Sequence, residues 1–114
     1  MPYLKLQTNV TSEAPARTQL MQALSKTVAE QLGKPERYVM VAIESGAPMI
    51  FAGDEGPLAY MELKSIGLPE TSTPALSESL SGVIERELGI PGDRIYIEFA
   101  NAQRHLWGWN KKTF

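Results

Sequence analysis

The sequence predicts an α+β domain in which two duplicated β-α-β units form a four-stranded mixed sheet with two helices on one face. The first observation behind this prediction is an internal repeat, because residues 20–41 match residues 76–97 at a constant offset of 56. The second is that each copy holds an apolar stripe of helical spacing between two β-type segments. The third is length, since 114 residues suffice for one hydrophobic core. Residues 1–114 are therefore expected to form a single domain.

Each unit opens with a short segment in which apolar and polar residues alternate. These segments are Tyr3–Thr8 and Tyr60–Ser65, which match position by position in kind or in polarity. A period of two is typical of a strand with one buried face. Two further strands are predicted after the helices, at Val39–Ile43 and Ile95–Ile97. A helix between two strands is the connection that parallel strands require.

Both helices are predicted from a four-residue apolar spacing that ends at a glycine. The first should begin near Ser12 as its cap, tolerate Pro15 in its first turn and end at Gly33. The second should have Thr73 as its cap and Pro74 at its first helical position. The apolar stripes comprise Leu20, Leu24, Val28 and Leu32 in the first helix, and Leu76, Leu80, Val83, Ile84 and Leu88 in the second, before Gly89.

The strands after the helices are apolar at successive positions, which is the pattern of strands buried on both faces. Two helices on one face leave the other face bare, and the chain has no further segment to cover it. Another copy of the chain is the expected cover. Residues 45–48 and 53–57 are expected to be connectors around a short apolar run, and residues 106–110 a short aromatic strand at the edge of an interface.

Composition excludes several classes of function. A formal charge of −2 and only one pair of adjacent lysines do not supply the positive field of a nucleic-acid-binding protein. The chain has no cysteine, which excludes disulfides, thiol catalysis and cysteine metal sites, and its single histidine, His105, leaves only a carboxylate-based option for a metal site. No metal ligand is assigned. No apolar run approaches the ~20 residues of a membrane span, and no signal peptide is evident. A cytoplasmic location is the default expectation.

Pro2 has two interpretations. Removal of Met1, which is usual before a small second residue, would make the Pro2 nitrogen a free secondary amine at the start of a strand. Such an amine, held in place by a sheet, could act as a base. The alternative is that Pro2 is only the non-pairing first residue of the strand.

Six short motifs in order give the chain a resemblance to the macrophage migration inhibitory factor family. Each motif alone is weak, but the resemblance runs from end to end with similar spacing. The motifs are Met1-Pro2, Thr8-Asn9-Val10, Gly33-Lys34-Pro35, Ser65-Ile66-Gly67, Asp93-Arg94-Ile95-Tyr96-Ile97, and Gly108-Trp109-Asn110 before Thr113-Phe114.

The resemblance implies a homotrimer with an active site at each subunit boundary. It also implies keto-enol tautomerase activity on arylpyruvates such as phenylpyruvate, with Pro2 as the catalytic base and no cofactor. The family also includes secreted signalling proteins without signal peptides. A cytokine-like protein that binds a receptor, with a secondary or vestigial tautomerase pocket and non-classical secretion, is therefore the alternative function.

The resemblance assigns five residues besides Pro2 to the substrate site. Lys34 would pair with the substrate carboxylate and lower the pKa of the Pro2 amine. Ser65 and Ile66 would end the strand beside the first, where Ile66 could offer an apolar wall and a backbone donor. Tyr96 and Trp109 would come from the neighbouring subunit and pack around the substrate ring. Without the resemblance, Lys34 would be interpreted as a solvated lysine after a helix. Ser65 and Ile66 would be interpreted as packing at a strand end, and Tyr96 and Trp109 as packing at an interface.

Two further candidates depart from the family pattern. Glu98 stands where the animal proteins carry an asparagine that helps bind the substrate, so its carboxylate would repel an anionic substrate unless it is turned away. Trp107 stands where a smaller apolar residue is usual, which predicts a narrower or more aromatic pocket mouth. The Cys-x-x-Cys pair of the animal proteins is replaced by Leu58-Ala59-Tyr60-Met61, so thiol-based activity is excluded.

Overall fold

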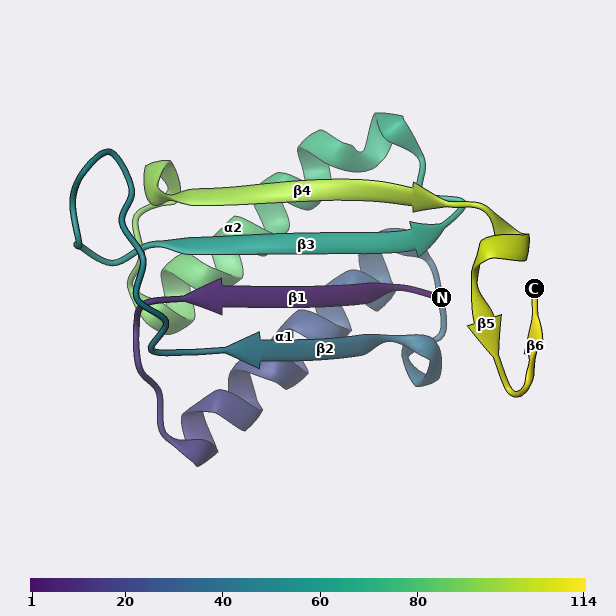
Figure 1. Ribbon diagram of the computed structural model, residues 1–114, viewed down its shortest axis with the longest axis horizontal. Coiled ribbons are helices and arrows are strands. Elements are labelled where there is room, and N and C mark those ends of the chain that lie inside the picture. Colours follow the sequence, from purple (N-terminus) through teal and green to yellow (C-terminus); the bar gives the residue numbers. More distant parts are fainter.

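The computed structural model describes residues 1–114. The chain forms two layers, a four-stranded sheet and two antiparallel helices that pack on one of its faces (Figure 1). The strand order is β2-β1-β3-β4, and a separate two-stranded hairpin, β5-β6, follows at the C-terminus. The elements are β1 Tyr3–Thr8, α1 Ala14–Leu32, β2 Met40–Glu44, β3 Ala59–Ile66, α2 Thr73–Leu88, β4 Ile95–Ala102, β5 Gly108–Trp109 and β6 Lys112–Thr113.

The predicted duplication and mixed sheet are confirmed. β1 is parallel to β2, and β3 is parallel to β4, so each unit is a strand, a helix and a parallel strand. The two units meet through β1 and β3, which pair antiparallel at the centre of the sheet. Because β1 is paired on both of its edges, the start of the chain lies inside the sheet.

The core lies between the sheet and the helices and follows the predicted stripes. The buried face of the two central strands meets the buried stripe of each helix, and all of these side chains have an exposed fraction of 0 or 1%. Burying one such side chain stabilises the fold by about 1.5 to 3 kcal/mol. The contacting residues are Leu4, Leu6, Met61 and Leu63 from the strands, and Leu20, Leu24, Val28, Leu76, Leu80 and Ile84 from the helices.

The helix ends agree with the predictions at the C-termini and differ at the N-termini. Gly33 and Gly89 end the helices in the left-handed conformation, with φ of 62° and 68°. The cap of α1 is Glu13 rather than Ser12, and its side chain makes no capping bond. Pro15 lacks an N–H, which removes one of the donors that a cap side chain would satisfy.

The start of α2 differs in the other direction, because α2 begins one residue earlier than predicted. Thr73 is the first helical residue, Ser72 occupies the cap position, and Pro74 follows Thr73 instead of standing first. A 3₁₀ turn at Glu70–Ser72 runs directly into the helix. The Thr73 hydroxyl donates a hydrogen bond of 3.0 Å to the Glu70 carbonyl, so it serves the turn and not the helix terminus.

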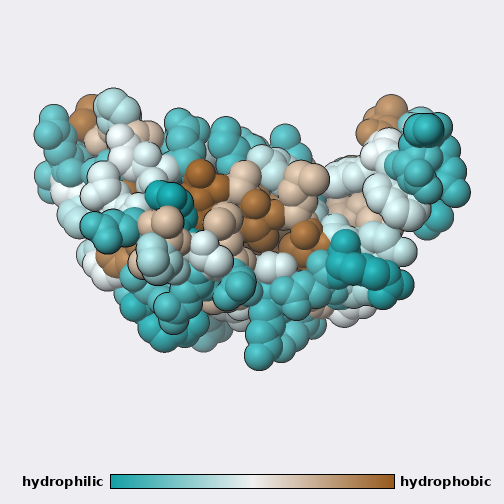
Figure 2. All heavy atoms as spheres, turned by 90° about the horizontal axis from the view of Figure 1, so that it is seen from below, coloured by the Kyte–Doolittle hydropathy of each residue, from teal (hydrophilic) through white to brown (hydrophobic).

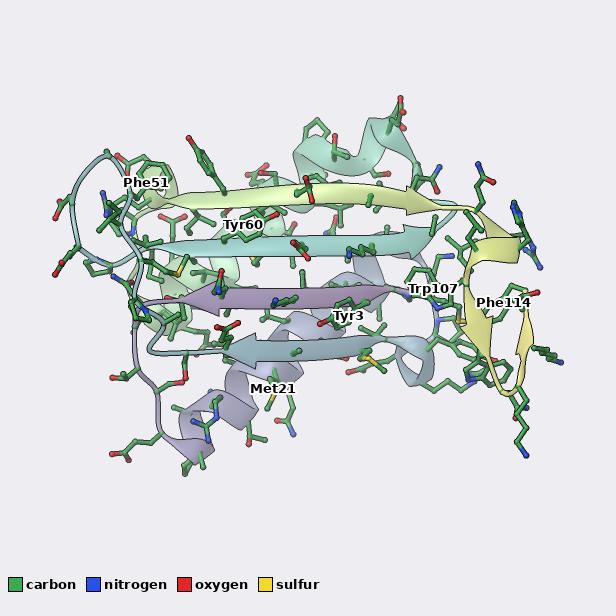
Figure 3. All side chains as sticks on the ribbon, in the orientation of Figure 1. Tyr3, Met21, Phe51, Tyr60, Trp107 and Phe114 are labelled. Carbon is green, nitrogen blue, oxygen red and sulfur yellow. The ribbon has the colours of Figure 1, made fainter.

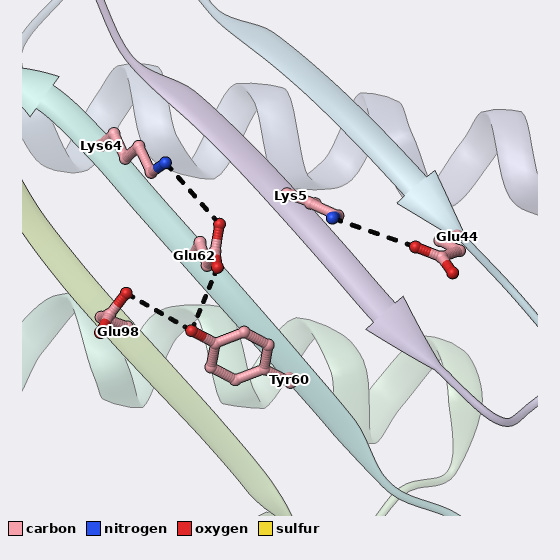
Figure 4. Close-up of polar contacts among 6 residues, drawn as sticks. All are labelled: Lys5, Glu44, Tyr60, Glu62, Lys64 and Glu98. Carbon is pink, nitrogen blue, oxygen red and sulfur yellow. Dashed lines mark hydrogen bonds and ion pairs between the residues drawn. The ribbon is translucent and has the colours of Figure 1, made fainter. Parts of the chain in front are cut away.

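The sheet face opposite the helices is polar over its central strands, which corrects the expectation of a second apolar face. Cross-strand partners share a face, so Lys5, Glu62 and Lys64 lie on it together. Figure 4 shows the contacts among them: Lys64 lies 3.9 Å from Glu62, and Lys5 lies 4.0 Å from Glu44. The reason is the strict alternation of β1 and β3, whose outward positions are mostly polar.

Within the sheet, large exposed apolar side chains lie on the outer strands; the others lie in the β2–β3 loop and the C-terminal segment. Met40 on β2 is 66% exposed and Tyr96 on β4 is 65% exposed. Figure 2 views the molecule from the side of β2, where apolar residues gather at the centre between two raised ends. An unpaired outer strand with apolar side chains is a surface that another chain can cover.

The loop between β2 and β3 is held by Arg94 and by Asn9, whose side-chain amide donates to the carbonyls of Glu55 at 2.9 Å and Gly56 at 3.0 Å. The Arg94 guanidinium donates to the carbonyls of Pro57 at 2.8 Å, Asp54 at 3.0 Å, and Phe51 and Gly56 at 3.2 Å. It also lies 5.3 Å from the centre of the Phe51 ring. The loop is therefore a fixed structure tied to the start of β4.

The C-terminal segment predicted as a short aromatic strand is a hairpin after a 3₁₀ turn at Arg104–Leu106. Asn110 and Lys111 form its two-residue turn and both have a positive φ, of 52° and 65°. This is the backbone of a type I′ turn, which matches the twist of the two strands. The turn brings Phe114 back onto Trp109, with the rings stacked at 5.7 Å.

We expect Arg94→Ala to lower the free energy of unfolding by about 1 to 3 kcal/mol, because several loop carbonyls lose a charged donor. The amides of Phe51 and Asp54, which bond to each other's carbonyls at 3.0 Å, should lose protection from hydrogen exchange. Denaturant unfolding and hydrogen exchange check this. Arg86→Ala is the matched control, since Arg86 makes only an exposed contact of 3.8 Å with its neighbour Glu87. Unchanged exchange in Arg94→Ala would contradict the assignment.

Candidate active site

A pocket of about 440 Å³ opens where the start of β1 meets the C-terminal hairpin. Its wall combines the first three residues, the turn before β2, and the beginning of β5. Figure 3 shows Trp107 and Phe114 at this end of the sheet and Phe51 at the other. The lining residues are Met1, Pro2, Tyr3, Arg37, Tyr38, Val39, Met40, Trp107, Gly108 and Trp109.

Pro2 is buried at this pocket and is fixed by the backbone. Its carbonyl accepts a hydrogen bond of 3.0 Å from the amide of Met40, which extends the pairing of β1 with β2 by one residue. As the first member of a paired strand, Pro2 needs no N–H of its own. With Met1 in place, the Pro2 nitrogen is an amide; once Met1 is removed, it is an amine at the same position.

Lys34 is placed beside the amino terminus by the end of α1. The Gly33 amide bonds to the Glu30 carbonyl at 3.4 Å and the Lys34 amide to the Ala29 carbonyl at 3.0 Å, which is a Schellman motif. The Lys34 ammonium then reaches across to β3 and donates to the Ile66 carbonyl at 2.9 Å. Lys34 forms no ion pair with a carboxylate. It does not line the pocket itself, but its charge acts on the terminal amine at the pocket's edge.

The environment lowers the pKa of the terminal amine. Burial lowers the pKa of the Met1 amino group below its ordinary value, and the charge of Lys34 and a hydrogen bond to Lys34 lower it further. Both effects disfavour the ammonium form, burial by removing water and Lys34 by repulsion. An amine at this place is therefore neutral at a lower pH than an ordinary terminal amine.

Aromatic rings form one wall of the pocket and come from this same chain. Trp109 meets Tyr38 edge to face with ring centres 5.8 Å apart and stacks on Phe114 on its other side. Trp109, which was expected from the neighbouring subunit, lines the pocket of Pro2 within its own chain, because the hairpin lies at the end of the sheet where β1 begins (Figure 1). Trp107 also lines the pocket, as expected for an aromatic mouth.

Ser65 and Ile66 share one backbone group. The side chain of Ser65 is fully buried on the helix side of β3, and its hydroxyl donates to the Ile66 carbonyl at 3.3 Å. That carbonyl is also the acceptor for Lys34. The group offered toward Lys34 is therefore an acceptor, and Ser65 reaches the site through it.

Tyr96 and Glu98 do not meet Pro2 within one chain. Tyr96 is paired with Tyr60 at the far end of the sheet, where its ring packs against Phe51 at 4.8 Å. Glu98 lies on the polar sheet face, where it accepts a 3.4 Å hydrogen bond from the Tyr60 hydroxyl. Tyr60 also donates to Glu62 at 3.2 Å, and burial together with these two carboxylates raises the pKa of Tyr60.

Several lining residues were not predicted as site residues, among them Arg37 and Tyr38, which carry polar groups. Arg37 and Tyr38 lie in the 3₁₀ turn Glu36–Tyr38, immediately after Lys34 and Pro35. The available signal was their position in the sequence, between Lys34 and the strand that pairs with β1. Four residues span only a short distance, so residues of this turn must lie close to Pro2. No group of three or more histidine or acidic side chains is arranged to hold a metal ion.

No helix of the structure combines the length and apolar character that crossing a membrane requires.

The duplicated β-α-β fold and the proline-bearing pocket at its first strand define a protein of the tautomerase superfamily. A family profile described as Macrophage migration inhibitory factor (MIF) matches residues 1–114. The chain belongs to the macrophage migration inhibitory factor family.

Individual relatives agree over almost the whole chain. A macrophage migration inhibitory factor homolog from Brugia malayi is 38% identical over 116 residues, covering 100% of this chain and 99% of the relative. The crystal structure of a homologue from Prochlorococcus marinus has 48% identity and a TM-score of 0.92, covering 98% of both chains. The factor from Toxoplasma gondii has 32% identity and a TM-score of 0.92, covering 98% of this chain and 99% of the other.

We expect Lys34→Ala to raise the pKa of the terminal amine of the Met1-bearing chain toward its ordinary value, because the repelling cation is gone. Burial remains, so the pKa should stay below that of an exposed terminal amine. The pH dependence of acylation of the amine measures it. Lys34→Arg, which keeps the positive charge, should leave the pKa near that of the unchanged chain. An unaltered pKa in Lys34→Ala would show that Lys34 does not act on this amine.

Proposed function

We propose that the protein is a keto-enol tautomerase of arylpyruvates such as phenylpyruvate, with the Pro2 amine as its base after removal of Met1. The observation that carries this proposal is the environment of the terminal amine. Burial and Lys34 both lower the pKa of an amine at this end of the chain. A proton-transfer group works best when its pKa lies near the working pH, and an ordinary secondary amine is too basic.

In the proposed reaction, the neutral Pro2 amine takes a proton from the carbon between the ring and the keto group. The electron pair of that C–H bond becomes the C=C bond of the enol, and the keto oxygen takes a proton from a water molecule. The hydroxide so formed recovers the proton from the Pro2 ammonium, which restores the neutral amine. The reverse reaction returns the proton from the Pro2 ammonium to the same carbon. No electrons enter or leave, so the reaction needs no redox cofactor.

The remaining roles follow the charges and shapes of the side chains. Lys34 pairs with the substrate carboxylate, and Ile66 offers an apolar surface beside it. Trp109 and Trp107 pack along the substrate ring from the same chain. Ser65 supports the Ile66 carbonyl from behind.

We propose a homotrimer in which Tyr96 and Glu98 reach the pocket of the neighbouring subunit. Two observations support an assembly: the exposed Tyr96 and the exposed apolar edge at β2. The Tyr60 hydroxyl donates a hydrogen bond to the Glu98 carboxylate on the sheet face. This contact supports an orientation in which the carboxylate points away from an anionic substrate.

The family covers both tautomerase and cytokine-like roles. The lowered amine pKa favours the enzyme, because binding a receptor does not require a neutral amine. A buried proline with a nearby unpaired cation serves proton transfer from a carbon acid and has no evident use on an interaction surface.

Retention of Met1 should abolish turnover of phenylpyruvate while leaving the assembly intact, because an amide nitrogen cannot accept the proton. Protein beginning at Pro2 should be active, with kcat/KM rising with pH through the pKa of the Pro2 amine and then levelling off. An ultraviolet assay, with the terminus of each sample confirmed by mass spectrometry, makes the comparison. Pro2→Gly, with Met1 removed, should keep partial activity through its primary amine. Equal turnover by protein that fully retains Met1 would refute Pro2 as the base.

Light scattering should give three times the chain mass of 12.6 kDa at micromolar concentration. The physical reason is that the exposed edge at β2 and the exposed Tyr96 lose water-accessible apolar surface on assembly. Tyr96→Ala should weaken the turnover of phenylpyruvate if this residue completes a neighbour's pocket, even where the mass stays unchanged. A stable monomer would exclude the shared site.

A further inference from the structure

The pocket beside Pro2 contains a single charged side chain, Arg37. The other side chains that line it are apolar or aromatic, and none is acidic. Arg37 forms no ion pair and no side-chain hydrogen bond with the protein. Its five N–H donors are therefore available to something that enters the pocket.

Arg37 is also held in place. Its guanidinium lies over the Tyr38 ring, 4.7 Å from the ring centre. Tyr38 in turn packs edge to face on Trp109, and Trp109 stacks on Phe114. A guanidinium stacked on a ring keeps its donors at its edge, where they can bind a carboxylate with two parallel hydrogen bonds.

Arg37 and Lys34 flank Pro2 on opposite sides. β1 lies between β2 and β3 in the sheet. The Lys34 ammonium is bound at the end of β3 through the Ile66 carbonyl, whereas Arg37 lies in the turn that leads into β2. Two unpaired cations on either side of one buried residue match a ligand with two separated negative charges.

We propose that Arg37 is a specificity-determining residue that favours doubly anionic 2-oxo acids, in which an aromatic ring carries a second acidic group. This inference rests on the proposed tautomerase function and names its substrate class. Lys34 binds the carboxylate next to the keto group, and Arg37 binds the acidic group at the far end of the ring. The ring lies along Trp109 between them.

The test compares phenylpyruvate with 4-carboxyphenylpyruvate in protein beginning at Pro2. The ratio is the kcat/KM for 4-carboxyphenylpyruvate divided by the kcat/KM for phenylpyruvate. This ratio should fall roughly tenfold in Arg37→Gln, which is the scale of a hydrogen bond to a charged group at a partly exposed site. Arg37→Lys should give an intermediate ratio, because it keeps the charge but loses the paired donors. Arg86→Gln, on the outer surface of α2, should leave the ratio unchanged. Added salt should lower the ratio in the unchanged protein.

A binding measurement separates this inference from the proposed catalysis. Isothermal titration with 4-carboxyphenylacetate and phenylacetate, which resemble the substrates but lack the keto group, needs no turnover. The dianion should bind more tightly, and Arg37→Gln should remove that preference. Absence of turnover with an Arg37-dependent preference would refute the tautomerase alone. An equal ratio in the unchanged protein and Arg37→Gln, or no preference for the dianion, would overturn the role of Arg37.

Discussion

The pairing of β1 along both of its edges is the constraint on which the site depends. A chain terminus ordinarily frays, because few contacts repay the entropy lost by ordering it. Here the first strand lies between β2 and β3, and the Met40 amide extends the pairing to the Pro2 carbonyl. The same pairing sets the end of β3 beside the start of β1, so the acceptor of Lys34 lies next to the terminus. One strand thus assembles the amine, the cation and the pocket.

The internal repeat was sufficient to predict the sheet, since periodicity reports which face of each element is buried. Gly33 and Gly89 predicted the helix ends because left-handed residues favour glycine. The helix starts were less predictable, because several polar residues near each start could cap it and a 3₁₀ turn replaced one cap. Alternation in β1 and β3 already indicated polar outward positions, whereas the apolar pattern of the outer strands suggested a bare apolar face.

The site was predictable only as far as chain order determines it. Periodicity locates Pro2 at a strand start and Lys34 at a helix end, but their predicted roles came from the resemblance to the family. Trp109 depends on how the last residues fold back, and no local pattern states which sheet edge a hairpin meets. Ser65 shows the same limit: the register of β3 turns its side chain into the core, and its link to the site is one shared carbonyl.

Folding of the C-terminal hairpin is coupled to ligand binding in the pocket, because Trp109 belongs to both. Its strands have two residues each, and Lys111 adopts a left-handed backbone that costs a non-glycine residue free energy. Packing of Trp109 edge to face on Tyr38 and stacked on Phe114 offsets that cost. A molecule that touches Trp109 only in the folded hairpin stabilises the hairpin by the same free energy that the folded hairpin adds to its binding. Folding of the last seven residues and ligand binding in the pocket are therefore thermodynamically coupled. A truncation at the C-terminus should weaken the binding of a ligand beside Pro2.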